Sequence, residues 1–291
     1  MYGEERSHLI TVTTLSLTTR THMVQSQRRR SHIYIERIAP YSRKSTVIQW
    51  EVSTKYRASG ALTFKIELSG NPLGPWELLA ENLVDKLVYE DTNFKTDGGL
   101  KDRYYRVSFQ DGSEVSDPKS IFGYMPKQQY LIARKIFNDE MVLLKKGNGI
   151  PISVIKRKHW GDRCTCVDPI TKQVMDPNCQ ICHGTKIVQG YYDSINTWGK
   201  LNPAAMGTDY GTHGPIQEIE NSQFMLLSFP LVYKDDILVE IDINRRWTVV
   251  SSQSTELRRN AVHQEVLVSR LPVYHSAYDL EVNSCYHRKL S

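Results

Sequence analysis

The chain has 291 residues, a formal net charge of +5, 40% hydrophobic residues and 24% charged residues. This length suffices for two domains with cores of their own, and the composition excludes a disordered chain. The charge is too small for this length to indicate a nucleic-acid-binding protein by itself, and the absence of any run of 18 apolar residues predicts no membrane span.

Residues 1–31 are predicted to form an N-terminal arm. They lack apolar periodicity and end in the cluster Arg28, Arg29 and Arg30, so we expect a segment that is disordered or orders only on a partner. The threonine-rich stretch from Leu9 to Leu17 is too polar for the core of a signal peptide. We therefore expect a reducing compartment, where clustered cysteines bind metal more often than they pair.

Residues 32–122 show short runs of alternating apolar residues with turns between them. The positions at period two include Phe64, Ile66 and Leu68 in one run and Tyr105, Val107 and Phe109 in another. Six or seven short strands within about 90 residues favour a β-sandwich with its own core, which we expect to fold independently and to project outward.

Four stretches of this region carry a family resemblance: the run around Trp50, "GPWELLA" (74–80), "YYRV" (104–107) and "SDP" (116–118). Together they resemble a fibronectin type III domain. The resemblance implies an immunoglobulin-like sandwich, and it implies no chemistry, because such domains act as spacers or binding modules.

A helix is predicted from Pro126 to Lys146, within a linking region at 123–148. Its apolar residues recur at spacings of three or four: Tyr130, Ala133, Phe137, Met141 and Leu144. Proline suits a first turn, lysines suit the last turn, and Gly147 ends the pattern. We expect this apolar stripe to pack on the C-terminal unit.

Residues 149–291 form a second β-rich unit. The predicted strands are "IPISVIKRK", "KIVQGYYD", "SQFMLLSFPL", "DDILVEI", "RRWTVVSSQS" and "QEVLVSRLPV". Residues 199–222 are rich in glycine and proline and are predicted to be a long loop, which is usually functional or bound to a partner.

Four cysteines lie between the runs "IPISVIKRK" and "KIVQGYYD", at Cys164, Cys166, Cys179 and Cys182. Two close pairs across a loop can place four thiolates at the corners of a tetrahedron around one zinc ion. Two disulfides, an iron site and unliganded thiols remain alternatives. His159 and His183 lie nearby and could replace Cys164 or support the site from outside.

The stretch "CQICHGT" (179–185) resembles one knuckle of a zinc ribbon or of the zinc module of DnaJ-type chaperones. The resemblance implies a structural zinc ion, and Gly184 would let the chain turn closely past a metal-bound sulfur. Four cysteine ligands leave no position for a catalytic water. Cys285 is expected to be a free thiol.

No enzyme motif stands out. Zinc deaminases combine H-x-E with a later P-C-x-x-C, whereas here His263 and Glu265 follow Cys179 and Cys182, in the reverse order. Phosphate-binding glycine loops, G-x-S-x-G and H-E-x-x-H do not occur. We expect no catalytic residues and no enzymatic activity.

Four segments of the C-terminal unit carry a second resemblance: "GIPISVIKR" (149–157), "KDDILV" (234–239), "RRWTVV" (245–250) and "RLP" (270–272). They resemble the small β-barrel of head-closure and related neck proteins of tailed phages. The resemblance implies that residues 159–187 are an insertion between the first barrel strands. The expected fold is therefore mainly β: an N-terminal fibronectin type III-like sandwich, a linking helix, and a C-terminal small β-barrel with a zinc-binding insertion.

The second resemblance implies a structural virion protein, made in the host cytoplasm, that forms a homo-oligomeric ring in the neck at the head–tail junction. Its expected partners are copies of itself, neighbouring neck, portal or tail proteins, and DNA in the bore, with no membrane. The arm, the 199–222 loop and the basic segment 145–163 are the expected contacts with neighbouring rings. A tail or baseplate component, a zinc-ribbon nucleic-acid-binding protein and an enzyme without visible motifs remain alternatives.

Overall fold

The computed structural model describes residues 31–41, 45–53, 55–56, 60–92, 102–122, 126–176, 178–202, 221–257 and 260–282. The predictions for the arm at 1–31, apart from Ser31, for most of the 199–222 loop and for Cys285 fall outside these residues.

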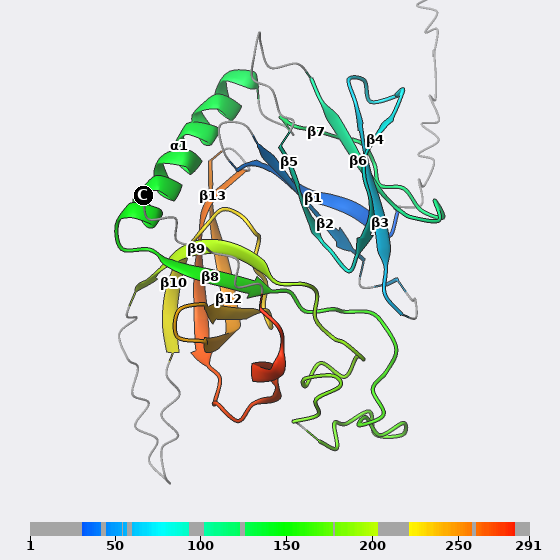
Figure 1. The fold of residues 1–291 in the computed structure, drawn as a ribbon, viewed down its shortest axis with the longest axis vertical. Coiled ribbons are helices and arrows are strands. Elements are labelled where there is room, and N and C mark those ends of the chain that lie inside the picture. The colour runs from blue at the N-terminus through cyan, green and yellow to red at the C-terminus, as the bar shows by residue number, and fades with distance from the viewer. Residues whose placement is uncertain are drawn as a thin grey trace, which may run out of the picture. The chain divides into compact units, whose positions relative to one another are not determined.

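Two antiparallel sheets form the N-terminal sandwich (Figure 1). The first contains β1 (Ile33–Pro40), β2 (Thr46–Val52) and β5 (Val88–Asp91). The second has the order β4-β3-β6-β7, with β3 (Thr63–Ser69), β4 (Glu77–Val84), β6 (Tyr104–Phe109) and β7 (Lys119–Ser120). Alternate residues such as Phe64, Ile66 and Val107 are fully buried between the sheets, as expected for a sandwich. The predicted sandwich is confirmed.

Six antiparallel strands close the C-terminal barrel in the order β10-β13-β12-β11-β8-β9. They are β8 (Ile150–Ile155), β9 (Ile195–Asn202), β10 (Asn221–Leu227), β11 (Ile237–Glu240), β12 (Arg245–Leu257) and β13 (Asn260–Arg270), followed by the 3-10 helix η1 (Ser276–Asp279). Buried apolar side chains such as Phe224, Leu238 and Trp247 form one cluster inside it, which is typical of a small barrel filled by its own side chains. The predicted mainly β chain with a C-terminal barrel is confirmed.

The predicted helix is α1 (Lys127–Lys146), with Pro126 and Gly147 as its flanking residues. Its buried residues are Tyr130, Phe137, Met141 and Leu144. The last three share a core with Leu227 and Phe229 of the barrel unit and with Ala39 and Val47 of the sandwich. The helix therefore packs on the barrel, as predicted, and on the sandwich as well. The helix found among the described residues is not long and apolar enough to cross a membrane.

Two local predictions in the barrel unit are wrong. The run "KIVQGYYD" (186–193) is not a strand and pairs only through isolated bridges at Ile187 and Tyr191. The strand after the cysteines is instead β9, so residues 199–202 belong to a strand and not to the predicted loop. Lys186 and Gln189 have positive φ values of 70° and 47°, which break an extended run.

Charged side chains join the sandwich to the barrel unit. Lys156, 2% exposed, bonds to Glu51 of β2 and lies 3.9 Å from Glu36 of β1. Lys158, 4% exposed, bonds to Asp85 at 3.0 Å. These two lysines belong to the basic segment that was expected to contact neighbouring rings. They are buried within the chain instead, which corrects that part of the expectation.

Backbone contacts also cross this junction. Arg37 of β1 donates to the carbonyl of Ser228, and the Leu231 amide donates to Gln49 Oε1 at 3.0 Å. Residues Ser31–Ser291 accordingly form one compact unit. Independent folding of residues 32–122 stays a prediction, and the structure gives the two β units a shared core rather than a projecting sandwich.

Candidate metal centre

The four cysteines lie on a long loop between β8 and β9, the first two strands of the barrel. These strands pair directly with each other, from Ile150–Gly199 to Val154–Ile195, so the loop leaves and re-enters the barrel at the same end. Its own folding relies on isolated bridges such as Arg163–Ile187 and Val167–Val174. Backbone hydrogen bonds also cross the loop, for example from the Val188 N–H to the Asp162 carbonyl at 2.9 Å.

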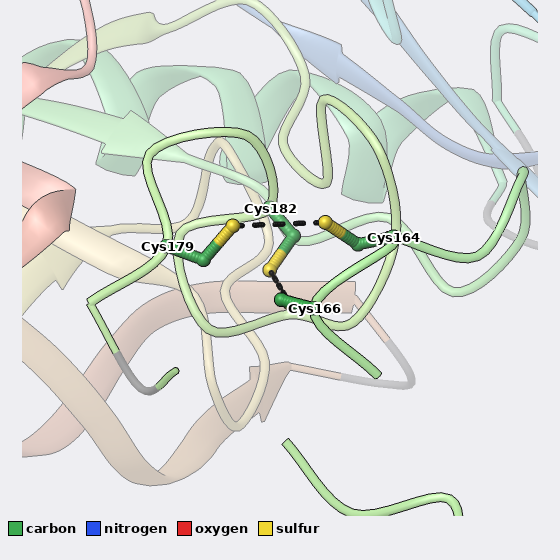
Figure 2. A group of neighbouring side chains, drawn as sticks. All are labelled: Cys164, Cys166, Cys179 and Cys182. Carbon is green, nitrogen blue, oxygen red and sulfur yellow. Dashed lines mark hydrogen bonds between the residues drawn. The ribbon is translucent and has the colours of Figure 1, made fainter. Parts of the chain in front are cut away.

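Figure 2 shows the four thiols pointing toward one another. The Sγ atoms of Cys164 and Cys179 are 3.6 Å apart, those of Cys166 and Cys182 are 3.4 Å apart, and all four lie within 4.8 Å of one another. Sulfur atoms around a zinc ion with bonds of about 2.3 Å lie about 3.8 Å apart at tetrahedral corners. The four cysteines can therefore hold a metal ion.

The same distances argue against the disulfide alternative. A disulfide needs a sulfur–sulfur distance of about 2.05 Å, and each measured distance exceeds this by more than an ångström. All four described cysteines are free thiols. The short distances also connect the C-x-C pair to the C-x-x-C pair, so each half of the motif supplies two corners of one cluster.

The second half of the motif forms a tight turn around its sulfurs. Backbone hydrogen bonding by Cys182 and Ile181 lowers the pKa of Cys179, and that by Lys186 and Gly184 acts in the same direction on Cys182. His183 and Gly184 adopt positive φ values of 47° and 80°, which turn the chain back past the sulfur, as the sequence predicted for Gly184. Donors aimed at sulfur stabilise a thiolate, the form that binds metal.

The thiols differ in acidity because their surroundings differ. The N–H groups of Cys182 and Ile181 lower the pKa of Cys179 to about 7. Burial raises the pKa of Cys166 and of Cys182. Packed thiols without a cation resist ionisation together, whereas a bound divalent cation would favour the deprotonated form of each.

The interior of the loop contains almost nothing except these cysteines. Its buried cluster consists of Cys164, Val167, Cys179 and Cys182, with Cys166 packed against it. Its larger aliphatic side chains point outward, with Ile170 87% exposed and Met175 73% exposed. One buried valine cannot offset the chain entropy of a loop this long, so a metal ion would supply most of the stabilisation.

The base of the loop is fixed by residues that the sequence analysis did not single out. Trp160 and Tyr192 belong to the sandwich core, and the indole N–H donates to the tyrosine oxygen at 2.7 Å. Lys158, beside them, bonds to Asp85, a residue 73 positions away. A partner so distant leaves no local pattern in the sequence, although "KHW" (158–160) does contain the two anchoring side chains.

The histidines considered as ligands lie elsewhere. The group of potential ligands found among the described residues contains only the four cysteines. His183 Nδ1 lies 2.8 Å from the Ser276 carbonyl, which connects the loop to η1. His263 lies 3.7 Å from Glu140 of α1, and Gln223 donates to Glu265. Both H-x-E residues thus have structural contacts on the barrel, away from the thiols.

A set of four sulfur ligands suits zinc or iron and fills a tetrahedron without an open position. No protein-family model matches the chain, and no curated protein matches it. The function must therefore be argued from the fold and from the chemistry of the thiol cluster.

Proposed function

We propose that this chain is a structural protein of a tailed-phage virion, which assembles into a ring in the neck at the head–tail junction around the DNA channel. Cys164, Cys166, Cys179 and Cys182 would hold a structural zinc ion. The observation that carries the proposal is the filled, closed barrel with the cysteine loop between its first two strands. This arrangement accords with the barrel resemblance and offers surfaces rather than an internal ligand site.

The barrel interior supports a role based on surfaces. Its members Ile152, Phe224, Leu238, Val266 and Val268 are fully buried, and they contact one another across the barrel. A barrel that binds a small ligand needs a cavity lined with a few convergent polar groups. Here the space between the strands holds apolar side chains.

One cavity outside the barrel is also built from structural contacts. It measures about 310 Å³ and lies between β1, α1 and the segment after β10. Two of its cationic side chains already bind backbone carbonyls: Arg37 binds that of Ser228, and Lys119 donates to that of Glu36 at 2.7 Å. These groups hold the junction together, so we assign no catalytic role to the cavity.

The nucleic-acid-binding alternative loses part of its basis. The basic run Lys156–Lys158 suggested a surface for acidic partners, but its three side chains pair with Glu51, Asp235 and Asp85. Basic side chains that are already paired with carboxylates displace few counterions from the phosphates of a nucleic acid, so they contribute little to its binding. The proposal therefore keeps DNA as a molecule that passes through the ring and not as a sequence-specific ligand.

The test is electron microscopy of the purified, zinc-loaded chain and mass spectrometry of purified particles. We expect closed rings with a central opening, and the chain among the virion proteins. A chain that forms no ring and binds DNA with a steep dependence on salt would favour the nucleic-acid-binding alternative instead.

A further inference from the structure

Helix α1 has two apolar faces. The inner face contains the buried residues Tyr130, Phe137, Met141 and Leu144. The outer face contains four large aliphatic residues that are substantially exposed: Leu131 (37%), Ile132 (54%), Val142 (52%) and Leu143 (67%). In Figure 1 the labelled strands all lie to one side of this helix. An exposed apolar stripe of this kind marks an interaction surface in a soluble protein.

The outer face has a regular layout. Leu131 and Ile132 form one pair, and Val142 and Leu143 form another, about 16 Å further along the axis at 1.5 Å per residue. At 100° per residue the four side chains fall within an arc of about 120°. Lys135 and Asp139 are exposed within the same arc, between the two pairs. Neither forms an ion pair within the part of the chain that the structure describes.

This layout is complementary to itself. A second helix placed antiparallel, with the two-fold axis at the level of Phe137, brings Leu131 beside Val142 of the second copy and Ile132 beside Leu143. The same rotation brings Lys135 opposite Asp139, twice. A two-fold interface requires this property, because residue i must contact residue j while j contacts i.

We infer that the outer face of α1 binds the same face of a second copy of this chain, as an antiparallel two-fold pair. The aliphatic pairs form its two ends, and two Lys135–Asp139 ion pairs form its centre. The contact is one helix wide, so it falls at the small end of specific interfaces and predicts a dissociation constant in the micromolar range, about 1–100 µM.

This inference does not rest on the proposed ring. A ring needs a heterologous contact between two different surfaces, whereas the α1 pair is isologous. A two-fold pair could join two rings or two single chains. The failure of one proposal therefore leaves the other standing.

The test is sedimentation velocity of the full chain over about 1–200 µM. Wild type should shift from monomer to dimer. Lys135→Asp and Asp139→Lys should each weaken association at least tenfold, because each places two like charges opposite each other. An equal mixture of the two variants should dimerise again, since every facing pair is then of opposite charge.

The mixture separates the proposed contact from effects within one helix. Lys135 and Asp139 are also i, i+4 neighbours, and changing either alters the helix by a few tenths of a kcal/mol, but mixing cannot repair that. Leu143→Asp should abolish dimerisation, whereas Leu78→Asp, at a 56% exposed position on β4, should not. A chain that stays monomeric, a dimer that tolerates both charge changes, or a mixture that does not associate would overturn the inference.

Discussion

Lys156 is enclosed where the two β units meet. Its ammonium group bonds to Glu51, lies near Glu36, and sits 4.7 Å from the centre of the Tyr233 ring. Burial opposes its charge, but Glu51, Glu36 and Asp236 together raise its pKa. One cation faces three carboxyl groups, so not all of the negative charge there is balanced.

The excess of negative charge affects the pKa of Glu36. Burial raises its pKa to about 7, with Glu51 and Asp236 adding to the rise and Lys156 opposing it. Gln49 donates to Glu36 Oε2 at 2.7 Å, and Tyr233 Oη contacts the other oxygen. The carboxyl group therefore retains its proton in the folded chain at a pH where the unfolded chain has released it.

We predict that the free energy of unfolding falls as pH rises from about 4.5 to about 7, because the folded state binds the Glu36 proton more tightly than the unfolded state does. The slope from this group is at most about 1.4 kcal/mol per pH unit. Glu36→Gln should make the profile shallower, as measured by urea unfolding across this range, while Asp236, whose pKa burial also raises to about 7, retains a slope of the same sign. Glu77→Gln, at an exposed position on β4, is the control, and an unchanged slope in Glu36→Gln would contradict the assignment.

At the scale of single residues, the sequence predicts the thiols and misses the buried charges. Cys164, Cys166, Cys179 and Cys182 lie close together in the chain, so their spacing carries the information. Lys156, in contrast, bonds to Glu51, which lies 105 positions earlier in the chain. From the sequence alone, a run of charged residues before a metal motif is interpreted as a solvated surface, because its partners in the folded chain lie far away in the sequence.

The cysteine cluster and the apolar cluster inside the barrel share no residue. Outside the cysteine cluster, Tyr191 packs against a second cluster around Ile155, Ile237 and Val239, and His183 contacts Ser276. Loss of a metal ion should therefore loosen the loop and spare the barrel, because each depends on different contacts.

We predict that chelation of the metal, or Cys179→Ser, removes amide-exchange protection from residues 163–188 while β12 and β13 stay protected. The purified chain should contain about one zinc ion, measured by elemental analysis. Cys285→Ser is the matched control and should change neither metal content nor exchange. Full protection of the loop in metal-free protein would show that the thiols need no ion.

Strand prediction succeeds where burial alternates and fails where it does not. The runs around Phe64 and Tyr105 alternate and form β3 and β6 as expected. The strand β9 reads "INTWGKLN", with few apolar residues, and Gly199 lies where a Cβ would come within 2.5 Å of Leu226 and 2.7 Å of Ile152. Close packing favours glycine there, although in the sequence it resembles a loop signal.

At the scale of the whole molecule, the sandwich supplies partners that the barrel unit needs. Glu51, Glu36 and Asp85 come from the sandwich and face lysines that are nearly inaccessible to water. Trp160 and Tyr192, at the base of the cysteine loop, complete the sandwich core. The strand patterns of the two units each indicate a complete fold, so these contacts between the units could not be predicted from the sequence.

We predict that deletion of residues 32–122 lowers the thermal stability of the barrel unit, measured by calorimetry. The deletion exposes Trp160 and Tyr192, which pack in the sandwich core, and the side of Phe137 that packs on the sandwich, and exposing apolar surface to water is unfavourable. An equally stable truncated barrel would show that the sandwich is an independent attachment, as its sequence first suggested.

The strand order of the barrel has a consequence for synthesis on the ribosome. Among the barrel strands, only β13 pairs with both β10 and β12. The edges of β10 and β12 therefore stay unpaired until the ribosome has made β13, which ends at Arg270. Cys182 emerges roughly ninety residues earlier, which at ordinary translation rates is on the order of ten seconds. During that interval the four thiols of the nascent chain can already bind a metal ion, while its unpaired strand edges are exposed to other chains.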